Sequence, residues 1–217
     1  MKNLVIMSAM ALMAINANAE KVKFEISGVV ADSIKEVVVI VNNDKNSSQK
    51  VTVANGRFNA VGEAEKNDLL NVGHEINRGF NSLVAINDGQ PIKMNFVENT
   101  VSGSSENSAL GNQIKANAAD EGRMAVLIKE YRELSKQNTA EADARIKEIM
   151  AEANAIEEKN MKASIEYIKA HKGDVTPVAF IQNVMYELSY NELAEIINPD
   201  VAYFNHPMVA KAKRIMD

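Results

Sequence analysis

The chain has 217 residues, of which 24% are charged and 46% hydrophobic, and a formal net charge of −5; this composition is typical of a globular protein. It contains no cysteine, which excludes disulfides, a cysteine nucleophile, a thiolate metal site and a CxxC redox pair. The mild acidity argues against nucleic-acid binding, and a chain without tryptophan and with only 5% aromatic residues offers little for stacking on bases or sugars.

The first residues are typical of a secretory signal peptide. Lys2 precedes an apolar run over residues 4–15, and Ala17-Asn18-Ala19 forms a small-x-small cleavage site. The run is shorter than the about 20 residues that cross a bilayer, so a retained anchor or a buried N-terminal helix is the less favoured alternative. We expect residues 1–19 to be removed, which leaves a soluble periplasmic or secreted chain that begins at Glu20.

Residues 20–104 have a hydrophobic period of two, which indicates half-buried strands. Val22, Phe24 and Ile26 alternate with charged residues, and Gly28 then indicates a bulge or bend. Strands are expected at residues 21–26, 34–42, 49–53, 57–61, 69–76, 82–87, 91–97 and 101–104. About eight short strands at regular turn spacing predict an antiparallel β-sandwich or a small barrel.

Two dipeptides predict tight turns within this β half. Ala54-Asn55-Gly56 separates the third and fourth expected strands, and Asp88-Gly89 separates the sixth and seventh. Asn-Gly and Asp-Gly favour two-residue β-hairpin loops. We therefore expect each of these two strand pairs to form an antiparallel hairpin.

Residues 105–217 have the period of a helix, which predicts a helical region packed on or beside the β domain. A first helix is expected at about residues 108–137, with Gly122 as a candidate break, and a second from its cap at Thr139 to Gly173. Further helix starts are predicted at Thr176-Pro177, Ser189-x-x-Glu192, Asn198-Pro199 and His206-Pro207. The fold class is therefore α+β. The two long helices are expected to form a hairpin, and a partner-binding stripe on their exposed faces remains open.

The histidines are the first candidates for chemistry. His74 is expected in a strand beside Glu75, and adjacent strand residues point to opposite faces, so the two cannot chelate one ion. His171 falls in the last turn of a helix, where a partial positive charge suits the dipole, and His206 precedes a proline. No HExxH or paired-histidine spacing occurs, so no histidine metal site is predicted.

Other motifs are equally sparse. Residues 44–48 resemble the start of a calcium loop, but Gln49 stands at its glycine position and Asn55 at its glutamate position, so a turn is expected instead. No GxSxG, GxGxxG or GxxxxGK[ST] motif occurs, and no nucleophile elbow or phosphate loop is therefore predicted. We predict no catalytic residue, no cofactor and no metal.

The order of these features resembles a known domain architecture. The features that carry the resemblance are Phe24-x-Ile26-x-Gly28, the segment Val53-Ala54-Asn55-Gly56-Arg57-Phe58, Asp88-Gly89, Val101-Ser102-Gly103-Ser104, and Asn107 with Leu110. The mature chain is similar to the accessory domain, a β-sandwich plus helices of unknown function, that precedes the thioredoxin-like domain in periplasmic thiol–disulfide interchange proteins of the TlpA/ResA type. That family places a CxxC motif in the domain that follows, whereas this chain ends at Asp217 without a cysteine. The thioredoxin domain is therefore expected to be absent, and thiol exchange is excluded because it needs a thiolate.

The sequence favours an exported, non-catalytic interaction or binding module, with a protein partner or a second copy as its contact. An exposed sheet edge would suit such a contact, because its unpaired backbone groups accept a strand. Neither nucleic-acid binding nor membrane insertion after signal cleavage is expected. The alternative is a carboxylate-based hydrolase or lyase that uses His74, which predicts a deep pocket with converging carboxylates.

Overall fold

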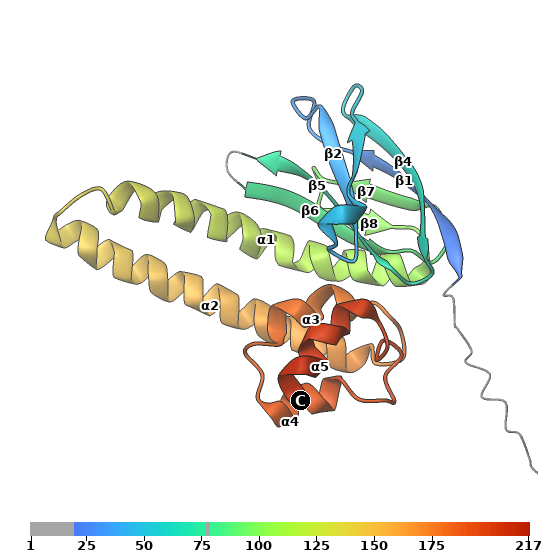
Figure 1. Ribbon diagram of the computed structural model, residues 1–217. Helices are drawn as coiled ribbons and strands as arrows, with labels where there is room; N and C mark the ends of the chain where they lie inside the picture. The colour runs from blue at the N-terminus through green and yellow to red at the C-terminus, as the bar shows by residue number, and fades with distance from the viewer. Residues whose placement is uncertain (1–19, 77–78) are drawn as a thin grey trace, which may run out of the picture.

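The fold is α+β, as the sequence predicts. The computed structural model describes residues 20–76 and 79–217, so the predicted signal peptide lies outside the described residues. Two four-stranded sheets face each other, and a helical region packs beside them (Figure 1). The sheets do not close into a barrel, and the sandwich is the prediction that holds.

Each sheet takes strands from distant parts of the β half. Sheet A has the order β4 (Arg57–Glu65), β1 (Lys21–Val29), β7 (Ile92–Asn95) and β8 (Thr100–Ser102). Sheet B has the order β3 (Gln49–Thr52), β2 (Glu36–Val41), β5 (Leu69–Ile76) and β6 (Gly79–Ile86). In the described strands the pairing is antiparallel except between β1 and β7, which are parallel. All eight predicted strands exist, although β1 and β4 extend beyond their predicted ends and β6 begins before its predicted start.

Both predicted hairpins are wrong in their pairing. The turn at Asn55-Gly56 exists, with φ of 53° and 68° at its two residues, but β3 pairs with β2 and β4 pairs with β1. Asp88-Gly89 likewise leads from β6 in sheet B to β7 in sheet A. A tight turn reverses the chain, but burial of the apolar faces decides which strand becomes the neighbour. Here both chain reversals pass from one sheet of the sandwich to the other.

Asparagine supplies the unusual backbone conformations of these turns. Among the described residues, the non-glycine positions with positive φ are all asparagines: Asn42, Asn43, Asn55, Asn67 and Asn99. Asparagine tolerates the left-handed region because its short side chain bonds locally to the backbone. The asparagines between the strands therefore help to end the strands at these turns.

The core between the sheets packs aromatic rings onto glycines. A Cβ atom on Gly28 would meet the Phe58 ring at 2.1 Å, and one on Gly62 would meet the Phe24 ring at 2.3 Å. The β1–β4 register runs unbroken through Gly28, so the predicted bulge at this residue is wrong. Both glycines instead let an aromatic ring of the neighbouring strand lie flat on the backbone.

Parts of β5 and β6 in sheet B are buried on both faces, which joins the two halves of the chain. Leu70 and Val72 of β5 face the sandwich core, whereas Leu69 and, on β6, Val84 and Ile86 pack against the helices. This follows from the alternation of side chains along a strand. One apolar cluster thus combines sheet B residues with helical residues such as Ile181.

The helical region consists of a long hairpin followed by short helices. Its elements are α1 (Ser105–Leu134), α2 (Ala140–Ala170), α3 (Val178–Val184), α4 (Tyr190–Ile196) and, after the short 3-10 helix η2 (Pro207–Val209), α5 (Ala210–Met216). The caps at Thr139 and Ser189 are confirmed, the latter as a full capping box. The candidate break at Gly122 is wrong, because α1 continues through it.

Two further predicted helix starts need correction. The Thr176 hydroxyl does not cap α3, because it donates to Asp174 Oδ1 at 2.5 Å and accepts from the Tyr167 hydroxyl at 2.9 Å. Asn198-Pro199 begins turns rather than a helix. His206-Pro207 does begin η2, as predicted.

The start of α1 closes one side of the sandwich. The buried Asn107 side chain accepts a hydrogen bond from Ile86 N at 2.8 Å and donates one to Ile86 O at 2.9 Å. Its carboxamide therefore occupies the position of a neighbouring strand at the edge of β6. At Gly111, α1 approaches β8 so closely that a Cβ atom would lie 2.0 Å from Val101 O. Helix α1 thus covers the outer edges of β6 and β8 together.

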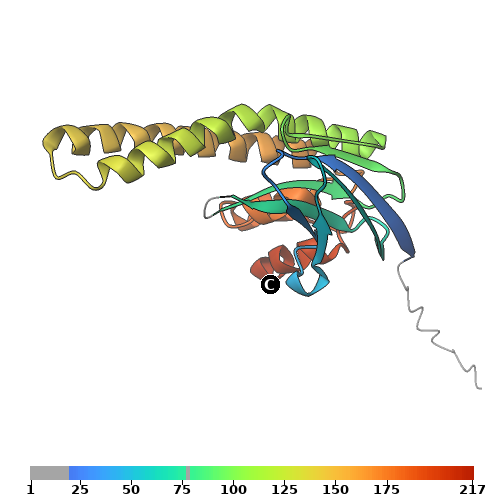
Figure 2. The ribbon, with the colours of Figure 1, turned by 90° about the horizontal axis from the view of Figure 1, so that it is seen from above.

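The far end of the α1–α2 hairpin projects beyond the sandwich (Figures 1 and 2). We call this part, residues 123–152, the arm. Leu127, Ala142 and Ile149 are buried within it, whereas the bases of both helices belong to the cluster that contains Leu110 and Ile168. The structure therefore supports the predicted hairpin, which packs on sheet B at its base and only on itself in the arm.

Replacing Asn107 with alanine tests the closure of the β6 edge. Asn107→Ala leaves the buried N–H of Ile86 without a partner and its C=O with only the bond from Asp88 N, so we expect the free energy of unfolding to fall by about 1–3 kcal/mol in urea denaturation. Asn112→Ala, at an exposed position of the same helix, is the control and should change it by less than about 0.5 kcal/mol. Equal effects of the two variants would contradict the strand-like role of Asn107.

Candidate functional site

Backbone groups or aromatic rings contact the side chains of all three histidines. His171 ends α2, with Nδ1 2.8 Å from Tyr167 O and its ring stacked on that tyrosine at 3.9 Å between centroids. His206 caps η2: its Nδ1 accepts from Met208 N at 3.1 Å, and its Nε2 donates to Asn67 O at 3.1 Å. Burial lowers the pKa of His206, which agrees with this neutral form.

His74 borders a cavity at one end of the sandwich. The buried ring lies 5.4 Å from the Phe96 ring, and Nδ1 lies 3.3 Å from Glu75 O. The cavity, about 410 Å³, is also lined by Glu36 and Glu75. The Glu36 carboxylate is already paired with Lys50 Nζ at 2.8 Å, and Glu75 is exposed whereas His74 is buried, as the strand alternation predicts. No group of three or more ligands able to hold a metal ion occurs in residues 20–76 and 79–217.

A second cavity, about 430 Å³, lies between the hairpin base, β6 and α3. Its apolar lining includes Ile114, Met161 and Phe180, and Glu121 stands at its exposed rim. Surrounding atoms raise the pKa of the Glu121 carboxyl by desolvation. Asn160 Oδ1 is buried there without a hydrogen-bond partner. Ser82, Ser164 and a second carboxyl, Glu157, also line the cavity, but its lining residues include no histidine or lysine that could act as a base on a serine hydroxyl.

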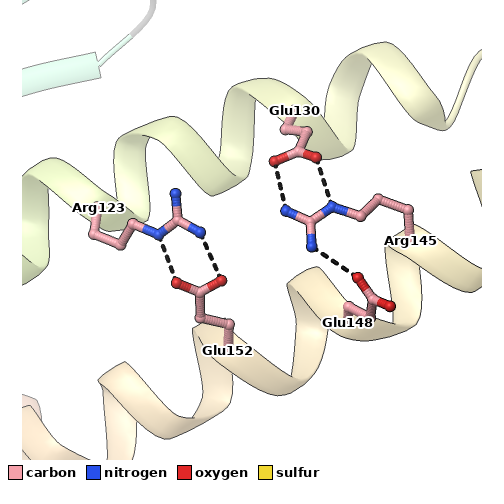
Figure 3. A network of polar contacts seen from close by, with 5 residues as sticks. All are labelled: Arg123, Glu130, Arg145, Glu148 and Glu152. Carbon is pink, nitrogen blue, oxygen red and sulfur yellow. Dashed lines mark hydrogen bonds and ion pairs between the residues drawn. The ribbon is translucent and has the colours of Figure 1, made fainter.

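The arm is braced by arginine–carboxylate pairs between its helices (Figure 3). Arg123 of α1 forms a two-pronged contact with Glu152 of α2, with Nη2 2.7 Å from Oε2. Arg145 of α2 contacts Glu130 of α1 at 2.7 and 3.1 Å, and Glu148 at 2.8 Å. Planar two-bond contacts of this kind fix orientation as well as distance. They hold the two arm helices in register where few buried side chains do so.

The outer edge of β4 is the remaining candidate. At the ends of the β1–β4 ladder, Val30 N donates to Gly56 O and Lys66 N donates to Glu20 O. Even-numbered residues of β4 therefore direct their backbone groups at β1, because bonded pairs alternate along an antiparallel ladder. Odd-numbered residues direct their N–H and C=O groups away from the sheet.

Contacts at the β4 edge agree with this alternation. Arg57 exchanges both of its backbone bonds with Ala54, and Glu65 N donates to Asp68 Oδ2 at 2.8 Å. Between them, Val61 O accepts from the Gln49 side chain at 3.2 Å. In the described part of the chain, the outward groups of Asn59 and Glu63 and the N–H of Val61 have no other partner. We call the outward groups of Asn59, Val61 and Glu63 the β4 edge.

The other sheet edges are short or covered. Asn107 and helix α1 cover β6 and β8, as described above. The edge strand β3 has only four residues and carries the exposed Lys50, and short, charged edge strands resist pairing with other chains. β4 has nine residues, and Val61 at its centre is 59% exposed. It is therefore the longest edge open to another strand.

Comparisons with models of protein families, with curated proteins and with solved structures found no match. No helix in the described ranges is long and apolar enough to cross a membrane. The candidate site therefore depends on the geometry of the chain itself.

The sequence predicted a sheet edge as the docking place but not which one. The predicted β3–β4 hairpin would have bonded the outward N–H and C=O groups of β4, which the structure leaves open, so the prediction did not single out this edge. The extent of β4 was also underestimated, because Gly62 and Ala64 are weak strand formers. The useful signal was the alternation from Arg57 to Glu65, in which the even-numbered residues are apolar or glycine and the odd-numbered residues are polar except for Val61.

The arm pairs predict a pH-dependent local stability. The guanidinium of Arg145 lowers the pKa of Glu130, and that of Arg123 lowers the pKa of Glu152, below the ordinary 4.5. This stabilisation is present above pH 4.5 and is lost as the pH falls through the lowered values. Amide-exchange protection of Leu127 and Ile149, corrected for intrinsic rates, should therefore fall in acid in the wild type.

A double variant isolates this effect. Glu130→Gln/Glu152→Gln should have low protection in the arm at neutral pH and little further loss in acid, whereas Glu141→Gln should behave as the wild type. A double variant with wild-type protection at neutral pH would show that the pairs do not brace the arm.

Proposed function

We propose that the mature chain is an exported, non-catalytic interaction module that accepts an extended strand at the β4 edge. The observation that carries this proposal is the row of outward backbone groups on Asn59, Val61 and Glu63, of which only Val61 O has a partner in the described residues, the exposed Gln49 side chain. Backbone N–H and C=O groups bind an added strand through main-chain hydrogen bonds, as in other cases of strand addition. The covered or short edges elsewhere favour β4 as the point of contact.

The absence of catalysis is part of the same proposal. The three imidazoles contact backbone groups or aromatic rings. The carboxylates of Glu36, Glu130, Glu148 and Glu152 pair with lysine or arginine. The alternative, a hydrolase or lyase that uses carboxylates, would need His74 and Glu36 to act together. The pairing of Glu36 with Lys50 speaks against that use.

The resemblance to accessory domains of thiol–disulfide interchange proteins gives the proposal a setting. A chain without cysteine contributes binding or positioning to such a system and leaves electron transfer to other proteins. The periplasm is the compartment that fits both the resemblance and the predicted leader.

Export is tested by cell fractionation and N-terminal sequencing in a Gram-negative host. We expect the protein in the periplasmic fraction with Glu20 as its first residue, because the small residues Ala17 and Ala19 fit signal peptidase. Full-length protein in the cytoplasm would refute the assignment of residues 1–19 as a leader.

Strand addition is tested by photocrosslinking in intact cells. A photoreactive amino acid at Glu63 should form a protein adduct, and Val61→Pro should abolish the adduct because proline removes an outward donor without breaking a bond to β1. Thr52→Pro is the matched control: Val53 N bonds to Lys35 O, so the N–H of Thr52 also points outward, but on β3. An adduct that persists in Val61→Pro, or none at all, would refute the proposal.

A further inference from the structure

We infer that the strand accepted at the β4 edge is β4 of a second copy of this chain, antiparallel to the first, with Val61 opposite Val61. This inference rests on the proposed function, since it names the partner of the same edge. The two sheets A would then join into one continuous sheet across a two-fold axis. Closed two-fold dimers of this kind use the same surface on both copies, so the β4 edge of each copy would be covered.

The backbone specifies the register. Pairing through the edge requires odd-numbered residues to face odd-numbered residues, because only these direct N–H and C=O groups outward. With Val61 opposite itself, Asn59 faces Glu63 of the second copy, and each facing pair exchanges two backbone bonds. Every residue of the β4 edge then meets a free residue.

In other registers, some outward groups of the β4 edge face residues whose backbone groups are already bonded, or like charges face each other. A shift that places Asn59 opposite Val61 also places Glu63 opposite Arg57, whose backbone bonds Ala54 already occupies. A shift the other way places Asn59 opposite Glu65, whose N–H is bonded to Asp68. Centring the pair on Glu63 would put two glutamates side by side, which is unfavourable on one sheet face. The register with Val61 at its centre has none of these defects.

The side chains complement each other in the same register. All odd-numbered residues of β4 point to the outer face of sheet A, since Phe58, Ala60 and Ala64 are buried in the core. At the centre the two Val61 side chains, each 59% exposed in the single chain, would cover each other. At both ends Arg57 of one copy would face Glu65 of the other, an attractive pair across strands.

In the single chain, one hydrogen bond at the β4 edge must break before a second copy can pair there. The Gln49 side chain bonds to Val61 O at 3.2 Å and is exposed. A long surface side chain can rotate away at the cost of one hydrogen bond, and the strand from the second copy replaces that bond. The contact protects Val61 O in the monomer without closing the edge.

Single cysteines test the register, because the natural chain has none. Facing Cα atoms of a bonded antiparallel pair lie about 5.5 Å apart, within the range for a disulfide. We expect oxidation of Val61→Cys to give a disulfide-linked dimer. Asn59→Cys should not link to itself, since the two copies of that position lie roughly 14 Å apart. A mixture of Asn59→Cys and Glu63→Cys should link as a heterodimer.

Charge reversal provides a second test, by sedimentation of the mature chain. Arg57→Glu and Glu65→Arg should each weaken the dimer, because each homodimer contains two like-charge pairs. A mixture of the two variants should restore it, because both pairs in the mixed dimer are attractive. Val61→Pro should sediment as a monomer, and Thr52→Pro as the wild type.

The outcomes separate this inference from the proposed function. Linkage of Asn59→Cys to itself, or failure of the charge-reversed variants to associate when mixed, would overturn the register. A wild-type monomer at all accessible concentrations would overturn the second copy as partner. In that case a Val61-dependent adduct to another protein in cells would leave strand addition standing, whereas no adduct would refute both.

Discussion

The fold depends on how the backbone groups at the sheet edges are satisfied. A sandwich of two open sheets has four edge strands, and each presents unpaired N–H and C=O groups. At β6 a side chain satisfies these groups: the carboxamide of Asn107 accepts a hydrogen bond from Ile86 N and donates one to Ile86 O. Asn107 lies in the first turn of α1, so this contact closes the β6 edge and positions the start of the helical hairpin beside it.

The helical region follows from this anchor. With α1 held along β6 and β8, its base, α2 and the short helices bury the second face of sheet B, and Leu69 and Ile86 join the helical core. The arm extends past this core and depends on its own few buried residues and on the arginine–carboxylate pairs. Because α1 lies along the edges formed by β6 and β8, β4 at the other edge of sheet A stays uncovered. That asymmetry leaves the β4 edge free for the strand addition that we propose.

Much of the local structure could be predicted from the sequence, and less of the long-range pairing. Alternation located every strand, and Thr139, Ser189 and His206 located three helix starts, because these signals act within a few residues. The Asn55-Gly56 turn was also found, but its strands separate into different sheets, since turn chemistry does not determine the neighbour. The β4 edge was missed for that reason. The role of Asn107 as a substitute strand depends on a contact with Ile86 that no local pattern reveals.

Amide hydrogen exchange across β4, at concentrations from dilute to high, tests the central claim most directly. Phe58, Ala60, Gly62 and Ala64 direct their N–H groups at β1, so their amides should be protected throughout. The amides of Asn59, Val61 and Glu63 should exchange rapidly in dilute solution and become protected as the concentration rises. Protection of these three amides in the dilute monomer, or rapid exchange at every concentration, would contradict the account of β4 as an open, pairing edge.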